Sequence, residues 1–342
     1  MDKKQQVIQF DNALAEVFEF DNGTEVKEYH AMIHASLTRL SFAQQLEAVM
    51  GAYTQMIEGP LCGAQAVFKR YFLSDAANQA DDVIVADVTD CAKSIIQQAP
   101  LDGTKIALWV YLMTNVQTGI GKSGLYEVRH GGFRHLWNGS AHNMAANSEY
   151  QTRLLFNEYN MQLIEEGCTL EANCIRTWFF VNDVDLNYGG VVRARNQFFF
   201  TQGLTVHTHF IASTGIGGRQ QDPNVLSQMD NYAIAGVKRE QIHYLYASTH
   251  MYSKDIIRQT HRMWENVEAL LAEADCNFND VAEMVVYLRD TADYDLVREL
   301  YDERFPGRPY VIVHAPVCRP GWLIEMECMA VKAVDLPTMP LF

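Results

Sequence analysis

The chain has 342 residues, of which 48% are hydrophobic and 20% charged, and this composition is typical of a globular protein with a substantial core. Its formal net charge of -15 argues against a general nucleic-acid binder, which would present a basic surface. No apolar run approaches the roughly 18 residues of a membrane-spanning helix, so we expect no membrane segment.

The first residues, the cysteines and the histidines indicate the cellular compartment and whether a metal site is expected. The first residues, MDKKQQVIQF, lack the apolar core of a signal peptide. The seven cysteines form no CxxC pair and are odd in number, which favours reduced thiols. His207 and His209 have metal-ligand spacing, but no third ligand accompanies them. We therefore expect a cytoplasmic protein without a metal or an organic cofactor.

The first third of the chain predicts two helices and two strands in alternation. A helix is expected over residues 41–59, and a strand over residues 64–75 that ends in Asp75. The stretch AANQADDVIVADVTDCAKSII, residues 76–96, has a helix-like pattern. IALWVYLM, residues 106–113, is typical of a buried strand.

Two later segments repeat this order more clearly. Residues 151–198 and residues 259–305 each begin with Gln-Thr and an amphipathic helix, and continue into a strand that ends in Asp183 or Asp290. Each then closes with a second helix that ends in phenylalanine. The strands predicted before the two segments are LWNGS (136–140) and LYAST (245–249). The repeat predicts tandem units and an α+β fold whose sheets are covered on one face by helices.

Near the end of the chain, residues 323–331 alternate as a strand does. One face would carry Glu325 and Glu327, two carboxylates on an otherwise apolar strand. A carboxyl group in an apolar cleft has a raised pKa, which suits it to general-acid chemistry near neutral pH. The strand pattern therefore makes this pair of carboxylates the candidate for acid–base chemistry.

The stretch FPGRPYVIVHAPVCRPGWLIEMECMAV, residues 305–331, resembles the closing segment of the RidA/YjgF family, with phenylalanine, proline, arginine, a strand and then a Glu-x-Glu strand. Members of that family are small α+β domains that assemble as trimers, with active sites in the clefts between subunits. The resemblance implies an intramolecular pseudo-trimer with units at residues 1–122, 123–238 and 239–342, of which the third carries the active site.

The same resemblance assigns two site residues. In the family, the arginine before the strand clamps the substrate carboxylate, and the first glutamate of Glu-x-Glu handles water or a proton. Those positions are Arg308 and Glu325 here. The alternative is an Arg308–Glu325 ion pair that only holds the strand in place. The first two units lack both groups, so we expect a single site.

Two further blocks resemble chorismatases, which are RidA-like pseudo-trimers that remove the enolpyruvyl group of chorismate. The first block is RTWFFVNDVD (176–185), followed by a tyrosine, arginines and a phenylalanine and then by ASTGIGG (212–218). The second is Val317-Cys318-Arg319 with the Leu-x-Glu-x-Glu strand. The resemblance maps the catalytic acid onto Glu325. It maps Cys318 onto the position where cysteine accompanies formation of 3-hydroxybenzoate instead of simple hydrolysis. The strand 247–250 departs from the Ser-Gly-Thr-Ala-Ser pattern of that family.

Substrate binding is assigned to residues near these blocks. The glycine-rich stretch offers a backbone wall for a carboxylate, and a helical arginine would neutralise a dianion if it points into the cleft. The candidate substrate-binding residues are Arg193, Ser213, Thr214, Gly215, Arg308, Tyr310, Cys318, Arg319 and Glu327.

Three functions are consistent with these residues. The preferred one is a chorismatase-like hydrolase or lyase. The second is a RidA-like deaminase that hydrolyses enamines or imines and needs only Arg308, Glu325 and a water molecule. The third is a ligand-binding protein without catalysis. In each case the expected partner is a small carboxylic acid, bound by a pseudo-trimeric monomer or a weak oligomer.

Overall fold

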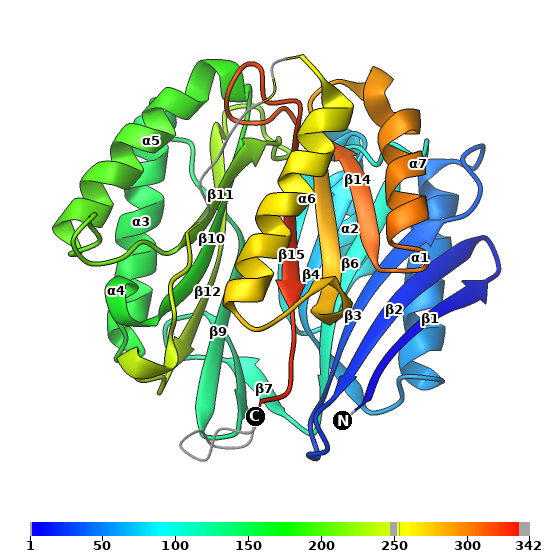
Figure 1. The fold of residues 1–342 in the computed structure, drawn as a ribbon, viewed down its shortest axis with the longest axis horizontal. Coiled ribbons are helices and arrows are strands. Elements are labelled where there is room, and N and C mark those ends of the chain that lie inside the picture. The colour runs from blue at the N-terminus through cyan, green and yellow to red at the C-terminus, as the bar shows by residue number, and fades with distance from the viewer. Residues whose placement is uncertain (1, 247–251, 253, 335–342) are drawn as a thin grey trace.

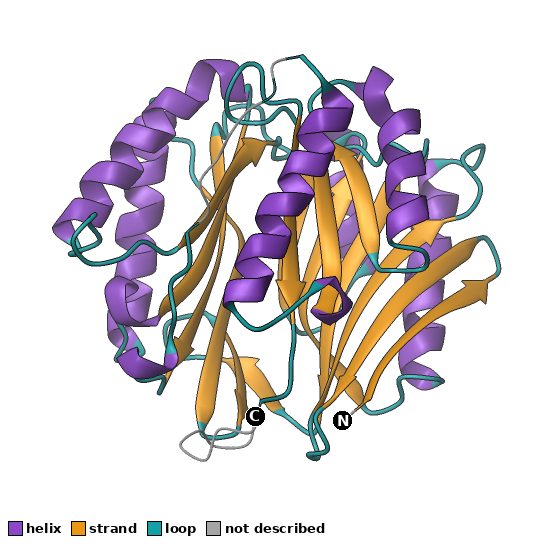
Figure 2. Cartoon of the chain, viewed as in Figure 1, coloured by secondary structure: helices purple, strands orange, loops and turns teal. Residues whose placement is uncertain are grey.

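The computed structural model describes residues 2–246, 252 and 254–334. In these residues the strands form three sheets whose inner faces meet at the centre of the molecule, and the helices lie on the outside (Figure 1, Figure 2). The prediction of an α+β fold built from three tandem units is confirmed.

The first unit is a six-stranded sheet with strand order β1-β2-β3-β6-β4-β5. Helices α1 and α2 pack against its outer face through an apolar cluster. The elements in chain order are β1 (Asp2–Phe10), β2 (Ala13–Asp21), β3 (Lys27–Ala35), α1 (Phe42–Glu58), β4 (Ala64–Leu73), α2 (Ala76–Ala86), β5 (Ala92–Gln97) and β6 (Ile106–Thr114).

The second unit repeats this connectivity, with strand order β11-β10-β12-β9-β8-β7. Its helices α3, α4 and α5 lie at the left of Figure 1, outside the sheet. The elements are β7 (Gln117–Ile120), β8 (Tyr126–His130), β9 (Phe133–His142), α3 (Ser148–Glu165), α4 (Leu170–Asn173), β10 (Cys174–Val181), α5 (Val184–Thr201), β11 (Ala212–Gly217) and β12 (Ser227–Ala235).

The third unit has a smaller sheet, with strand order β14-β13-β15 in the part of the chain that the structure describes. Its elements are α6 (Ile256–Glu273), β13 (Val281–Leu288), α7 (Tyr294–Arg304), β14 (Tyr310–His314) and β15 (Ile324–Ala330). These match the second half of the other two units. Leu245 and Tyr246, at the start of the predicted strand LYAST, lie in no strand, and residues 247–249 lie outside the described residues.

The glutamine that opens each repeat performs the same task in all three units. Gln45, Gln151 and Gln259 are buried near the start of α1, α3 and α6. Each side-chain oxygen accepts a backbone N–H at the beginning of the last strand of its unit, from Lys105, Leu226 with Ser227, and Leu323. Each side-chain nitrogen donates to nearby backbone carbonyls. The repeated glutamine therefore ties the helix to the sheet.

The first third has four strands beyond the two predicted, namely β1, β2 and β3 before α1, and β5 after α2. The helix-like stretch 76–96 is not one helix, because α2 ends at Ala86 and β5 pairs in parallel with β4. Alternate burial of Ala92, Ser94 and Ile96 shows the strand period that the helical pattern concealed. The chain passes from the first sheet to the second between β6 and β7, because β7 pairs with β8. This point lies shortly before the expected boundary at residue 122.

The three units are joined at the centre by a buried ionic cluster. The Arg70 side chain from β4 is fully buried. Its Nη2 lies 2.9 Å from Asp230 Oδ2 on β12, and its Nη1 lies 3.0 Å from Glu327 Oε1 on β15. One arginine of the first unit thus binds a carboxylate from each of the other two.

Candidate active site

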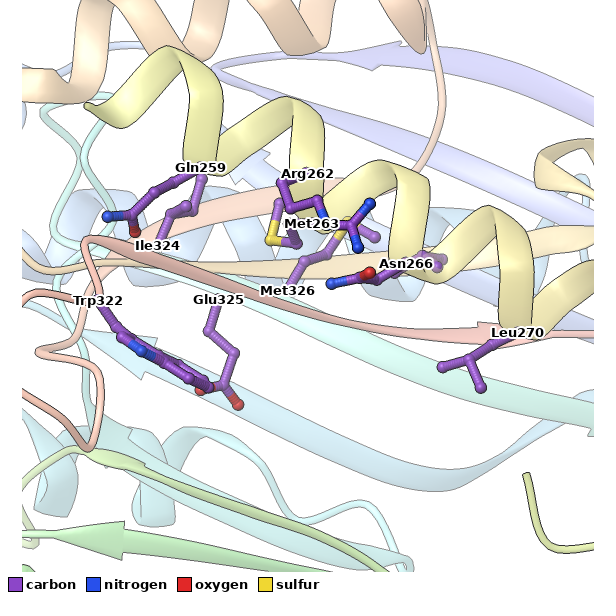
Figure 3. Close-up of a pocket in the computed structure, with 10 residues that line it drawn as sticks. Gln259, Arg262, Met263, Asn266, Leu270, Trp322, Ile324, Glu325 and Met326 are labelled. Carbon is purple, nitrogen blue, oxygen red and sulfur yellow. The ribbon is translucent and has the colours of Figure 1, made fainter. Parts of the chain in front are cut away.

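The predicted strand near the chain end is β15, and its alternation is as expected. Glu325 and Glu327 lie opposite Tyr287 and Val285 of β13, so both carboxylates are on the inner face of the sheet. A cavity of about 170 Å³ lies between β15 and α6, on the face of β15 opposite to the one that carries the Glu325 carboxyl group, and Glu325 is among its lining residues. In Figure 3 the Glu325 carboxyl group lies beside the Trp322 ring, on the side of the strand away from α6.

The environment of Glu325 favours its protonated form. Burial raises the pKa of this carboxyl group to about 7, and the nearby Glu327 carboxylate raises it further. Arg176 and Arg319 act in the opposite direction. A group with a pKa near 7 has substantial acid and base populations at neutral pH, as a general acid requires.

The Glu327 carboxylate is occupied by the protein itself. Oε1 accepts the Arg70 hydrogen bond, while Oε2 accepts from Arg176 Nη2 at 2.8 Å, Trp178 Nε1 at 2.9 Å and Thr214 Oγ1 at 3.2 Å. The side chain is also buried. Glu327 thus pairs with two arginines, and its carboxylate links β15 to the first and second units.

The second unit contributes Tyr188 and Gly215 to the surroundings of Cys318 and Glu325. Tyr188 of α5 lies over Gly215 of β11, where an added Cβ would come within 2.5 Å of the tyrosine ring. The Tyr188 hydroxyl and the Cys318 thiol lie near enough to shift each other's pKa. Burial and the neighbouring Cys318 raise the pKa of Tyr188 to about 12, so this hydroxyl remains a donor. Gly215 thus makes room for the ring, instead of offering its backbone to a ligand.

Cys318 lies beside Tyr188, where the second and third units meet, and its side chain is a protonated thiol. Burial and the Glu325 carboxylate raise its pKa above the usual value. A protonated thiol in contact with Tyr188 shapes the cleft and is a poor nucleophile. Arg319 is exposed at the rim, where its guanidinium lies 5.1 Å from the Trp322 ring centre, and its charge lowers the pKa of both Cys318 and Glu325.

Strand alternation separates Ser213 from Thr214. Thr214 faces inward and bonds Glu327, whereas Ser213 bonds Thr177 at 3.1 Å on the other face of the sheet and lines a different cavity. The two cannot both contact one ligand at Glu325. Arg193, also expected at the site, is 66% exposed and forms an ion pair with Glu149 on the outer surface.

Arg308 lies far from Glu325, so neither the expected shared site nor the alternative ion pair is formed. Arg308 Nη1 donates to the Val281 carbonyl at 2.7 Å, at the first residue of β13. Glu325 lies opposite Tyr287, near the last residue of that strand. Because a strand rises about 3.3 Å per residue, the two ends are roughly 20 Å apart.

Tyr310 belongs to the junction between the third and first units, and not to the Glu325 site. Its backbone N–H donates to Glu16 at 3.3 Å, and its carbonyl lies 3.2 Å from His34 Nε2. The other ring nitrogen of His34 lies 3.4 Å from Asp102 Oδ2. Carbonyl and carboxylate oxygens only accept, so both contacts require a hydrogen on each nitrogen and therefore an imidazolium ion.

This junction predicts a pH-dependent contribution to stability. Burial opposes protonation of His34, but Asp102 and Glu16 outweigh it and raise its pKa. A raised native pKa stabilises the fold fully below about pH 6.5, the unfolded value, and the stabilisation is lost as pH rises through the native pKa. We expect His34→Gln to lower the free energy of unfolding by about 1–2 kcal/mol at pH 5.5 and by less at pH 8.5 in urea titrations. An effect that is equal at both pH values would contradict an imidazolium ion.

Sequence reasoning missed Tyr188 and Arg176. Arg176 opens the quoted block RTWFFVNDVD, and the period of β10 places it on the same face as Trp178, which was a usable signal. Tyr188 is the tyrosine that follows this block, but its contact with Gly215 depends on how α5 crosses the sheet, which the sequence pattern does not contain. In the described ranges, no group of three or more His, Cys, Asp or Glu side chains is placed to hold a metal ion. Within the same ranges, no helix combines the length and apolar character needed to cross a bilayer.

Three comparisons relate this geometry to known proteins. A family model described as Endoribonuclease L-PSP matches residues 241–332. A RutC family protein of Pyrococcus abyssi is 41% identical over 80 residues, and the match covers 23% of this chain and 63% of that protein. The 3-aminoacrylate deaminase RutC of Acinetobacter baylyi is 33% identical over 78 residues, which cover 22% and 62%. The chain thus spans less than two thirds of the length of these two relatives.

The full tandem arrangement has a structural counterpart. A crystal structure of chorismatase superposes with a TM-score of 0.57 and covers 78% of this chain and 93% of its own. The sequence identity is 15%, so this similarity concerns the fold.

Proposed function

Since this chain belongs to the RidA/YjgF-like superfamily, in the tandem three-unit form whose fold chorismatase shares, we propose that it is an enzyme that removes the enolpyruvyl group of chorismate or a close analogue. The observation that carries the proposal is Glu325, a carboxyl group with a pKa of about 7 on the inner face of β15, where Arg176 and Tyr188 of the second unit lie near enough to interact with it electrostatically. Family relatives with enzymatic names support a catalytic role in general.

The proposed reaction begins with proton transfer from Glu325 to the methylene carbon of the enol ether. The C=C bond becomes a methyl group, and the adjacent carbon becomes an oxocarbenium-like centre. Water adds to that carbon and returns one proton to the Glu325 carboxylate. Breakdown of the hemiketal cleaves the ether C–O bond and releases pyruvate and a hydroxylated ring. A substrate hydroxyl in place of water would lead to an aromatic product.

The surrounding residues support this chemistry in separate ways. Arg176 and Arg319 bring positive charge to a substrate whose enolpyruvyl group carries a carboxylate. Cys318 and Tyr188 lie near each other and near Glu325, where they would limit the positions that a water molecule can occupy. Arg308 takes no part, because it lies at the other end of β13.

A deaminase is the second candidate, favoured by the match to the deaminase of Acinetobacter baylyi. The same Glu325 would protonate an enamine carbon, and water would then hydrolyse the resulting iminium to a ketone and ammonia. A deaminase in which Arg308 and Glu325 bind one substrate is disfavoured by their separation. A ligand-binding protein without catalysis would release neither pyruvate nor ammonia.

Product analysis separates these candidates. Purified protein is incubated with chorismate, and pyruvate is followed with lactate dehydrogenase and NADH. In parallel, 2-aminoacrylate generated in situ is supplied, and the loss of the free enamine is followed. Pyruvate from chorismate supports our proposal, whereas accelerated loss of 2-aminoacrylate without activity on chorismate would replace it with the deaminase. Thermal stabilisation by chorismate without either product would indicate a binding protein.

The raised pKa of Glu325 predicts the pH profile of the reaction. The acid form is the reactive one, so kcat/KM should be level below about pH 6 and fall toward tenfold per pH unit well above pH 7. The midpoint should lie near the pKa of about 7. Initial rates on chorismate between pH 5 and 9 measure this profile. A rate that rises through pH 7 would mean that the essential group acts as a base.

A further inference from the structure

The solvent-facing side of α3 carries an apolar stripe. Four large apolar side chains on this side are 45–60% exposed, namely Tyr150, Leu154, Met161 and Ile164. Asn157 is exposed between Leu154 and Met161. The steps from each of these five positions to the next are four, three, four and three residues, which is the spacing of the a and d positions in coiled-coil heptads. The stripe is therefore a continuous seam on the side of α3 that faces away from the sheet.

The repeat shows that a unit can fold without this stripe. The shared glutamine, which is Gln45 in α1, Gln151 in α3 and Gln259 in α6, aligns the three helices. In α1 the positions that correspond to the stripe are Gln44, Ala48, Gly51, Gln55 and Glu58. In α6 they are Arg258, Arg262, Glu265, Ala269 and Ala272. These positions are polar or small in both sister helices, so the fold of a unit does not explain the apolar side chains of α3.

Charged side chains flank the seam in a pattern that suits a second copy of the same helix. With Leu154 as an a position, Arg153 occupies a g position and Glu158 an e position. In a parallel pair, g lies beside the e position of the following heptad, so Arg153 of each copy would lie beside Glu158 of the other. An antiparallel pair places e beside e and would bring glutamates together. The charges therefore favour a parallel pair with two-fold symmetry.

Both charged groups are placed to make these contacts. The Arg153 guanidinium lies 5.5 Å from the ring centre of Tyr150, which is part of the seam. Its bonds to Glu149 at 3.2 Å and to Gln197 at 3.0 Å both use Nη2, so Nε and Nη1 can donate to a further carboxylate. Glu158 is exposed, and no cation pairs with it among the residues that the structure describes.

We propose that α3 is a dimerisation surface, on which a second copy of this chain places its own α3 in parallel. The four apolar side chains would pack on their counterparts, and the two Asn157 side chains would hydrogen-bond each other and fix the register. A single helix pair buries less than about 1,200 Å², at the low end for specific interfaces, so we expect a Kd on the order of 10 µM. The pairing does not depend on the proposed reaction, because α3 lies on the outside of the second unit (Figure 1).

Sedimentation velocity of the full chain tests this surface. Between about 1 and 200 µM, which brackets the expected Kd, the natural protein should pass from a monomer of 38.9 kDa to a dimer. Met161→Glu should raise the Kd by about tenfold or more, because dimerisation would bury a charge without a partner in the seam. Met161 is exposed in the monomer, so the variant should fold, and circular dichroism checks that it does.

Gln55→Glu is the matched control, because it adds the same charge at the corresponding position of α1. It should leave the Kd unchanged. A natural protein that stays monomeric at about 200 µM, a dimer that survives Met161→Glu, or an equal loss in both variants would overturn the proposal.

Cross-linking tests the orientation of the two helices. Leu154→Cys is made together with Cys62→Ser, since Cys62 is the exposed cysteine among those that the structure describes. In a parallel pair, position 154 faces its counterpart, so diamide should oxidise the two thiols to a disulfide that joins most of the dimer. In an antiparallel pair an a position faces a d position instead. A dimer that forms but stays unlinked would therefore overturn the parallel arrangement.

Discussion

Glu325→Gln is expected to lower kcat on chorismate by about two to four orders of magnitude, the usual scale for loss of a general acid. The amide keeps the volume of the side chain and most of its hydrogen-bonding capacity, but it cannot deliver a proton to carbon. Single-turnover measurements at saturating substrate give this value without interference from product release. Substrate affinity should change little, because Arg176 and Arg319 retain their charges.

Two comparisons separate chemistry from stability. Glu303→Gln, on the exposed surface of α7, makes the same chemical change away from the cleft and should leave kcat unchanged. The native pKa of Glu325 is above the unfolded value, so the stability of the natural protein declines as pH rises toward about 7. Glu325→Gln removes the ionisable group and should therefore remove this loss of stability. The Tm of the variant relative to the natural protein should therefore be higher at pH 8 than at pH 5. Near-full activity in Glu325→Gln would show that the paired carboxylates are structural.

The fold was predictable where local pattern carries it. The recurring glutamine and aspartate mark each helix start and strand end, and the same hydrogen bonds from Gln45, Gln151 and Gln259 explain why the repeat is visible at all. The strand β5 was missed because its few alternating residues follow directly on the helical pattern of α2.

The site was predictable only in part, because a resemblance transfers residue types and not their separation in this chain. Arg308 precedes β14, which runs parallel to β13, and must therefore lie at the start of β13. Glu325 opens β15, which runs antiparallel, and lies at the end of β13. Their separation follows from strand direction, which the sequence motif does not contain. Arg70, whose partners are on β12 and β15, belongs to no motif and becomes visible only when three units are assembled.

Arg70→Met should be the most destabilising of the substitutions that we consider. Its side chain is fully buried and pairs with Asp230 and Glu327, so its loss leaves the buried Asp230 without this counter-charge and removes one of the two arginines that pair with Glu327. Removal of one partner from such a cluster costs about 3–5 kcal/mol. We expect a decrease of that size in the free energy of unfolding, measured by urea titration at pH 7 with fluorescence of the buried tryptophans.

The same reasoning predicts a rescue. If uncompensated charge is the cause, then Asp230→Asn, added to Arg70→Met, should recover part of the lost stability, while Glu327 keeps its ion pair with Arg176. Asp230 also accepts the Ser140 backbone N–H at 2.8 Å, and Asn can keep that bond through its carbonyl oxygen. If the double variant is less stable than Arg70→Met, the stability of the junction depends on the shape and hydrogen bonds of these side chains, and not on the balance of charge among the three units.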